Sequence, residues 1–256
     1  MNGIFLSADG CAPCEYAGFF FALNLLNYLK NNFVIEICVI VMHPFGVTAI
    51  IIDNICGNAL AEIGFEAVQI SGTPVDPKEI KKYADKNGLT ICATHEGGDM
   101  IVNNPEAVIE KLALYNCQQT AYPCPMEYTV IDLASTLDFA NQLEKSAQKL
   151  EAAGMHLSYH NHNIEFRKFD RKAIFDILME NAPTMLAEID TYWIQMGGRN
   201  PLEYVKKYAN RQQIFHLKDF GVVYPRTSIM VPVGSGNLNW NKILPAAEAG
   251  GVEWFI

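Results

Sequence analysis

Short apolar segments alternate with longer amphipathic segments along the chain from about Ile52 to the last residue. The short segments have the length and the β-branched and aromatic residues of buried strands, and the longer ones have helical periodicity. Seven strands are predicted, at Glu66–Ile70, Leu89–Thr94, Cys117–Ala121, Met155–His160, Met185–Asp190, Ile214–Lys218 and Val252–Ile256. Phe33–Met42 has the composition of an eighth strand.

The helices are expected between these strands. Their predicted ranges are Asn58–Ile63, Pro77–Asn87, Pro105–Tyr115, Ile131–Ala153, Lys172–Asn181, Pro201–Asn210 and Trp240–Ala249. Three of them begin with a proline, which the first helical turn tolerates because its N–H groups have no partner inside the helix.

Regular alternation of strands and helices indicates parallel strand pairing through right-handed crossovers. Eight such units in 256 residues have the size of a (β/α)₈ TIM barrel. A doubly wound open sheet is the alternative architecture. No Gly-x-Gly-x-x-Gly motif follows an early strand, which disfavours the dinucleotide-binding form of that alternative.

The first fifty residues do not follow this pattern. Residues 1–50 are therefore treated as an atypical N-terminal segment that supplies at most a first strand and helix, and residues 51–256 as the barrel domain. The segment is rich in apolar residues. A secretory signal would require basic residues near its start, but no Lys or Arg precedes Lys30. Glu36, His43 and Pro44 suit a membrane span poorly, so no membrane role is expected.

Composition narrows the class of protein further. Charged residues make up 18% of the chain and hydrophobic residues 50%, which excludes intrinsic disorder. The net charge of −9 disfavours a nucleic-acid partner, which would call for a basic surface. Seven cysteines are an odd number at low density, so we expect a reducing, cytoplasmic location rather than a disulfide scaffold.

Polar residues stand where the predicted strands end, which is where a barrel carries its active site. His95 ends one strand and His160 another, while Asp190 and His216 fall on the next two. His160, Asp190 and His216 are each about one strand–helix unit apart, which places them on adjacent strands at one rim. Imidazole and carboxylate together suit a divalent ion such as Mn²⁺, Zn²⁺, Co²⁺ or Fe²⁺.

Four motifs resemble those of the sugar phosphate isomerase/epimerase family, within the xylose isomerase-like TIM barrel superfamily. The motifs are Tyr159–Phe166 (YHNHNIEF), Ile189–Gly198 (IDTYWIQMGG), Phe215–Asp219 (FHLKD) and Val233–Trp240 (VGSGNLNW). Their order and spacing extend the resemblance over roughly residues 57–256.

The resemblance implies a divalent metal ion, Mg²⁺ included, held by side chains from the last four strands. Asp190 and His216 match two of the family's ligands, and His160 stands where many relatives have a glutamate. His162, Glu165 and Lys218 are then the candidate catalytic residues. His95, Tyr192 and Trp193 are the candidate substrate-binding residues.

The implied activity is isomerisation or epimerisation of a small carbohydrate or polyol through an enediolate. The alternatives are a metal-dependent lyase or dehydratase acting on a keto-sugar or inosose, and a catalytically inactive barrel. The expected partner is a small sugar, and a homodimer is the expected assembly because an open barrel end exposes apolar surface.

Two departures from the family pattern are expected to affect the metal site and the closure of the barrel. The family's glutamate ligand on the eighth strand follows a segment like Gly251–Ile256, which is the last segment of the sequence. The first fifty residues do not resemble the family's first strand. We therefore expect an incomplete barrel with an irregular first unit and no last helix, from a gene whose two ends are truncated or misread.

Overall fold

The structure is a computed structural model, and it describes residues 38–41, 61, 64–73, 75–125 and 129–256. The predicted helix Asn58–Ile63, apart from Ala61, and most of the atypical N-terminal segment lie outside these ranges. Among the residues described, no helix is long and apolar enough to cross a membrane.

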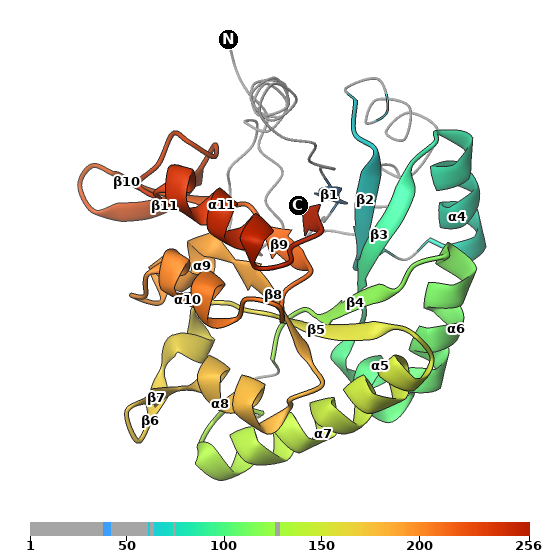
Figure 1. The fold of residues 1–256 in the computed structure, drawn as a ribbon, viewed down its shortest axis with the longest axis horizontal. Helices are drawn as coiled ribbons and strands as arrows, with labels where there is room; N and C mark the ends of the chain where they lie inside the picture. Colours follow the sequence, from blue (N-terminus) through green and yellow to red (C-terminus); the bar gives the residue numbers. More distant parts are fainter. Residues whose placement is uncertain (1–37, 42–60, 62–63, 74, 126–128) are drawn as a thin grey trace.

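Eight parallel strands form one curled sheet, shown at the centre of Figure 1. In sheet order they are β1 (Cys38–Val41), β2 (Ala67–Ser71), β3 (Thr90–His95), β4 (Gln119–Tyr122), β5 (His156–His160), β8 (Leu186–Asp190), β9 (Ile214–His216) and β12 (Trp254–Phe255). The order in the sheet is the order in the chain, as in a (β/α)₈ barrel. No strand pairing in the described residues joins β12 to β1, so the barrel is incomplete, as the sequence predicted.

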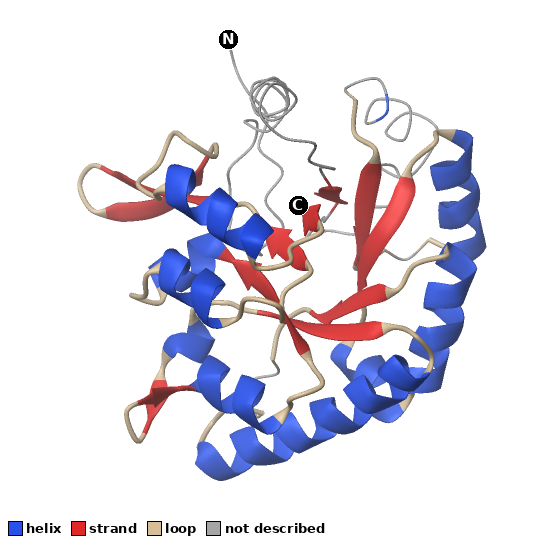
Figure 2. Cartoon of the chain, in the orientation of Figure 1, coloured by secondary structure: helices blue, strands red, loops and turns tan. Residues whose placement is uncertain are grey.

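Helices cover the outer face of this sheet, as Figure 2 shows in blue. They are α4 (Pro77–Lys86), α5 (Gly98–Asn103), α6 (Pro105–Tyr115), α7 (Leu133–Ala152), α8 (Ile174–Asn181), α9 (Thr191–Met196), α10 (Pro201–Lys207) and α11 (Trp240–Ala249). Side chains cap several of these helices. At the start of α7, the Asp132 carboxylate accepts from Ser135 N at 2.8 Å, so the helix begins at the next residue, Leu133.

Two small hairpins and one 3₁₀ turn were not predicted. Strands β6 (Lys168–Phe169) and β7 (Lys172–Ala173) pair after the 3₁₀ turn η1 (Ile164–Phe166), and β10 (Asp219–Val223) pairs with β11 (Thr227–Val231). The helices α5 and α9 were also missed. All of these are short elements inserted after strands, where a barrel places the loops of its active-site face.

The sheet separates two hydrophobic clusters. The larger packs between the strands and the surrounding helices, and the smaller consists of Ala67, Cys92, Ala93 and Ile214. Ala67 alternates with Gln69 along β2, so these two residues share a face of the strand. Ile214 has the same relation to His216 on β9. The smaller cluster therefore lies on the inner face of the sheet, one step below a layer of buried polar residues.

Candidate functional site

The parallel register brings two carboxylates beside two histidines on the inner face of the sheet. On β5 and β8, His160 is paired with Glu188, and on β8 and β9, Asp190 is paired with His216. All four are buried, with exposed fractions of 3% or less. Glu188 precedes Asp190 by two residues, so both point inward and Glu188 lies one layer deeper.

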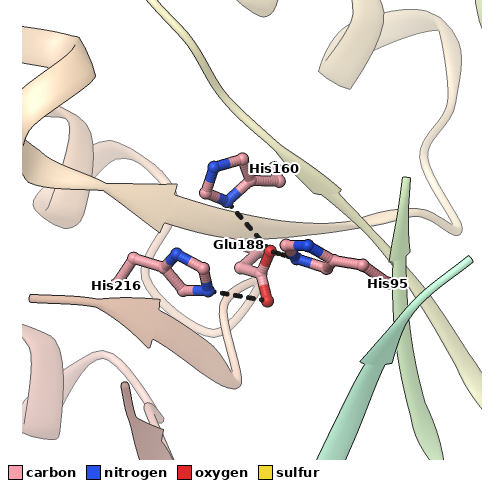
Figure 3. Close-up of side chains that lie close together, drawn as sticks. All are labelled: His95, His160, Glu188 and His216. Atoms are coloured by element: carbon pink, nitrogen blue, oxygen red, sulfur yellow. Dashed lines mark hydrogen bonds and ion pairs between the residues drawn. The ribbon is translucent and has the colours of Figure 1, made fainter. Parts of the chain in front are cut away.

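Glu188 is the centre of the deeper layer, as Figure 3 shows. Its Oε2 lies 2.5 Å from His95 Nε2 and 3.0 Å from His160 Nδ1. Its Oε1 lies 2.5 Å from Gln69 Nε2 and 3.4 Å from His216 Nε2. The His160 contact has the distance of an ion pair without the direction of a hydrogen bond.

Asp190 is fixed at the end of β8 by its neighbours. Its Oδ1 caps α9 by accepting from the backbone N of Tyr192 at 3.1 Å and of Trp193 at 3.3 Å. The side chain of Asn161 pairs with the Asp190 backbone, accepting from its N at 3.0 Å and donating to its O at 3.2 Å. The ends of β5 and β8 are therefore held together, and the second carboxylate oxygen is left to face the interior.

That second oxygen, Asp190 Oδ2, lies among three nitrogens. Lys218 Nζ is 2.9 Å away, His160 Nε2 is 3.7 Å away and His216 Nδ1 is 3.8 Å away. The Lys218 side chain is 23% exposed, whereas Asp190 is fully buried. This group of Asp190 Oδ2, Lys218 Nζ, His160 Nε2 and His216 Nδ1, called the outer layer, is thus the part of the site nearest to solvent.

Burial and neighbouring charges have opposite effects on the pKa values of Glu188 and Asp190. Burial alone would raise the pKa of Glu188, but the charges of His95 and His216 hold the pKa well below its usual range. Burial also opposes ionisation of Asp190, and the charge of Lys218 holds that pKa well below its usual range. Both carboxylates are therefore ionised, which is the form that binds metal.

The pKa values of His160 and His216 are shifted in opposite directions. Burial and the charge of His216 lower the pKa of His160 well below its ordinary value. Burial would lower the pKa of His216 too, but the charge of Glu188 outweighs it and the pKa is raised. A metal ion would therefore compete with a proton more strongly at His216 than at His160.

The donor set of the outer layer fits a divalent metal ion. Asp190 Oδ2 and His216 Nδ1 are buried and make no hydrogen bond among the described residues, although Asp190 Oδ2 forms the ion pair with Lys218. Their separation of 3.8 Å, and the 3.7 Å from Asp190 Oδ2 to His160 Nε2, approach the roughly 3.3 Å that separates two ligands of a tetrahedral ion. Small side-chain movements would complete such a site.

A second grouping of potential ligands lies in the deeper layer. One ligand atom each from His95, His160, Glu188 and His216 lies within 4.8 Å of the others. This set shares His160 and His216 with the outer layer but uses the opposite nitrogen of each ring. The same two imidazoles therefore face a carboxylate on both sides.

Three residues expected to be catalytic lie around the outer layer. The His162 ring is 4.9 Å from the His160 ring, measured between centroids, and Lys218 pairs with Asp190. Glu165 is fully buried, and it accepts from Tyr159 Oη at 2.9 Å and from His162 N at 2.9 Å. Burial raises the pKa of Glu165 to about 7. The structure thus places Glu165 behind His162 and not beside His160, Asp190 or His216.

The residues expected to bind substrate fall in two places, because the ring centroids of Tyr192 and Trp193 are 4.9 Å apart while His95 contacts Glu188. Trp193 lies beside His162, with 5.2 Å between ring centroids. Tyr192 is only 6% exposed and packs against Phe220 at 5.7 Å. His95 lies in the deeper layer, where it contacts Glu188 as described above.

The glycine-rich loop after β11 is organised by Asp219. The Asp219 carboxylate accepts from Gly234 N and Gly236 N, both at 2.9 Å. Backbone N–H groups in such loops often bind phosphate. Here two of them already serve a buried carboxylate of the chain itself, so those two donors are not available to a ligand.

Sequence reasoning missed Glu188, Gln69 and Asn161. Glu188 has a signal in the sequence, because it precedes Asp190 by two residues and must share its face of the strand. Asn161 lies inside the YHNH motif between two histidines. Gln69 has no such signal, because it lies within an apolar strand and its partners are more than a hundred residues away.

The fold and the site define a class of protein: a parallel β/α barrel with histidines and carboxylates converging at the carboxyl ends of its strands. The family described as xylose isomerase-like TIM barrel matches residues 58–256. The chain belongs to this family. None of the curated proteins matches it.

Solved structures share the fold at low sequence identity. A sugar phosphate isomerase/epimerase from Parabacteroides distasonis has a TM-score of 0.68 and 20% identity, over 86% of this chain and 84% of that one. A probable 3-DHS dehydratase from Bacillus anthracis has a TM-score of 0.63 and 11% identity, over 87% and 92%. A xylose isomerase-like protein from Mycobacterium smegmatis, solved in complex with magnesium, has a TM-score of 0.62 and 12% identity, over 78% and 79%.

Proposed function

We propose that this protein is a divalent-metal-dependent isomerase or epimerase of a small sugar or polyol. The observation that supports this most is the convergence of His160, Asp190 and His216 around one carboxylate oxygen. Membership in a family whose solved relatives include sugar phosphate isomerase/epimerases agrees with it. The proposal assigns the metal to the outer layer, where Lys218 is partly exposed and a substrate can enter.

The donor set bears on the metal. Two imidazoles and one carboxylate favour Mn²⁺, Co²⁺, Zn²⁺ or Fe²⁺ over Mg²⁺, which prefers oxygen ligands and bound water. When bound, such an ion supplies a Lewis acid that polarises a carbonyl and its neighbouring hydroxyl.

The chain's own residues have separate tasks in this proposal. His162 is placed to take a proton from the carbon next to the carbonyl and to return it, since its ring lies beside His160. Glu165 fixes the backbone of His162 through the 2.9 Å hydrogen bond and so aims the ring. Lys218 holds Asp190 ionised and presents a cationic donor at the same rim. Trp193 offers an apolar ring against which a sugar can pack.

The experiment begins with metal binding by the full chain. Zn²⁺, Mn²⁺ and Co²⁺ affinities are measured by competition with a chromophoric chelator for the wild type, Asp190→Ala and His216→Ala. Each substitution is expected to weaken binding at least roughly tenfold. His156→Ala is the matched control, because His156 lies on β5 as His160 does but at the opposite end. Unchanged metal binding in both site variants would remove the basis of the proposal.

The reaction itself is tested in deuterated water. The metal-loaded protein is incubated with a panel of ketoses, aldoses and inososes, and the products are examined by NMR. Deuterium at the carbon next to the carbonyl, with the carbon skeleton intact, is the expected result. Loss of a hydroxyl group as water would instead identify the dehydratase alternative. Turnover without metal, or in the presence of a chelator, would contradict the proposal.

A further inference from the structure

Glu188 lies directly behind both histidines of the proposed metal site. Each of its two carboxylate oxygens has two side-chain nitrogens near it. We propose that Glu188 is a positioning residue: it fixes the ring orientation and tautomer of His160 and His216, and it is not itself a metal ligand. This inference rests on the proposed function for the site it serves. The observations that carry it are the hydrogen-bonding roles of the surrounding side chains.

The tautomer of His216 follows from Gln69. The Gln69 amide nitrogen lies 2.5 Å from Glu188 Oε1, and an ionised carboxylate can only accept, so this end of Gln69 must be the donor. The amide oxygen of Gln69 consequently faces His216 Nε2 at 2.9 Å. Both neighbours of His216 Nε2 are acceptors, so this nitrogen carries a proton. The neutral ring then has its lone pair on Nδ1, the nitrogen that faces Asp190.

His160, with its ring reversed, has one acceptor at this end of the ring rather than two, and that contact has the distance but not the direction of a hydrogen bond. Its Nδ1 lies 3.0 Å from Glu188 Oε2, which again can only accept. A proton on Nδ1 leaves the lone pair of the neutral ring on Nε2, at 3.7 Å from Asp190 Oδ2. One buried carboxylate thus orients two imidazoles so that their lone pairs face the outer layer. Carboxylates behind metal-binding histidines commonly act in this way.

His95 completes the set of donors. Its Nδ1 lies 3.2 Å from Ser71 Oγ, and its Nε2 lies 2.5 Å from Glu188 Oε2. A carboxylate offers about four acceptor positions. Glu188 has four donors around it, two at each oxygen, from Gln69, His216, His95 and His160. The contacts from Gln69 and His95 have the geometry of hydrogen bonds, and those from His216 and His160 are ion-pair contacts, so both carboxylate oxygens are engaged without a metal ion.

The competing arrangement places a metal ion in the deeper layer. There Glu188 would be a ligand together with His95, His160 and His216. This arrangement requires the lone pair of His160 on Nδ1 and that of His216 on Nε2, which would set the latter against the Gln69 oxygen. The two arrangements therefore predict opposite coordinating nitrogens on the same two rings.

Nitrogen-15 NMR of the imidazole rings distinguishes the arrangements without any substitution. In the zinc-loaded full chain, we expect His160 to coordinate through Nε2 and His216 through Nδ1, with the other nitrogen of each ring protonated. Coordination through the opposite nitrogens would overturn the inference. Spectra of the metal-free protein at mildly alkaline pH are expected to show His160 protonated at Nδ1 and His216 at Nε2. If the wild type binds no metal, the proposed function fails, and these metal-free spectra still decide the role of Glu188.

Zinc affinity supplies the second measurement. Glu188→Gln keeps the size of the side chain but removes acceptors, so affinity is expected to fall roughly 10- to 100-fold, with zinc still bound through the same nitrogens. Glu96→Gln is the matched control, because Glu96 is also a buried carboxylate but pairs with Lys111 rather than with a proposed histidine ligand. Its zinc affinity is expected to equal that of the wild type. Wild-type affinity in Glu188→Gln would overturn the inference, and so would a complete loss of binding in a folded variant, which would identify Glu188 as a ligand.

Discussion

Glu188 and Asp219 are both fully buried carboxylates, yet they are surrounded by different kinds of donor. Glu188 is surrounded by side chains, three of them imidazoles. Asp219 is surrounded mainly by backbone. Its five donors are Phe220 N at 2.8 Å, Gly234 N and Gly236 N at 2.9 Å, Leu238 N at 3.2 Å and Trp240 Nε1 at 2.8 Å.

The difference indicates different roles. Backbone N–H groups can neither lose a proton nor bind a metal ion, so the carboxylate they surround stabilises a loop. Imidazoles have a second nitrogen, and those of His160 and His216 face Asp190 across the outer layer. Glu188 can therefore fix the orientation of imidazoles whose other nitrogens belong to the proposed metal site. Asp219 instead holds the loop after β11 to the start of β10.

The largest expected loss of stability follows from removing the Asp219 carboxylate. Asp219→Ala leaves five donors without an acceptor, at a cost of roughly 1 kcal/mol or more each, so we expect a loss of about 4 kcal/mol in the free energy of unfolding. Urea denaturation measures it. Asp85→Ala, which removes an exposed carboxylate paired with Lys81, is the control and should change stability by less than about 0.5 kcal/mol. A loss under about 1 kcal/mol for Asp219→Ala would show that the loop does not depend on this carboxylate.

Glu165 is a buried carboxylate with only two donors, and burial raises its pKa to about 7. Between the ordinary pKa of 4.5 and 7, the folded protein keeps a proton that the unfolded chain has lost. The contribution of Glu165 to stability is therefore full below about pH 4.5 and declines by about 3 kcal/mol as the pH rises to 7. Glu165→Gln should remove this part of the pH dependence.

The measurement is the free energy of unfolding of the wild type and Glu165→Gln across this pH range. Other groups, including His216, titrate in both proteins, so the difference between the two curves isolates Glu165. Glu151→Gln, at an exposed position, serves as the control. Parallel curves for the wild type and Glu165→Gln would mean that Glu165 is ionised throughout, with donors as effective as those of Asp219.

The sequence predicted the architecture because its signals are local and repeated. Each of the seven strands predicted in the barrel domain overlaps an observed strand, and the eighth overlaps β1. Strand ends were predictable for the same reason, so the proximity of His160, Asp190 and His216 followed from the parallel sheet. The short elements between strands were missed, since α5, α9 and the β10–β11 hairpin form on loops fixed by tertiary contacts such as those of Asp219.

The strand periodicity places Glu188 on the same face as Asp190, but it could not predict what Glu188 contacts in the deeper layer. Its centre, Glu188, lies in the middle of a strand whose neighbours are apolar, and its contacts with Gln69 and His95 span 119 and 93 residues. Only the curvature of the sheet brings these side chains, from β2, β3 and β8, together. The expected role of His95 in binding substrate remains a prediction, and its place in the deeper layer suits a positioning role better.

The packing around Asp219 gives a smaller expected effect. A Cβ added to Gly236 would lie 2.4 Å from Asp219 Oδ1 and 2.5 Å from the backbone O of Phe220. We therefore expect Gly236→Ala to lower the free energy of unfolding by about 2 kcal/mol, because the loop must move away from the carboxylate. Gly97→Ala is the control, since a Cβ there meets nothing within 4 Å. Equal stability of the two variants in urea denaturation would show that the loop adapts without loss.

The smallest effect is expected at the outer edge of the Glu188 group. Ser71→Ala removes the 3.2 Å contact with His95 Nδ1 and should cost about 1 kcal/mol of unfolding free energy. Ser146→Ala, which removes a buried 2.8 Å hydrogen bond to Ile101 O far from the site, should cost about the same. Zinc affinity should change less than about threefold in either variant, because Ser71 touches neither His160 nor His216. If Ser71→Ala weakened zinc binding as much as Glu188→Gln, the orientation of the rings would depend on the whole polar layer, and Glu188 would be one member of it rather than its centre.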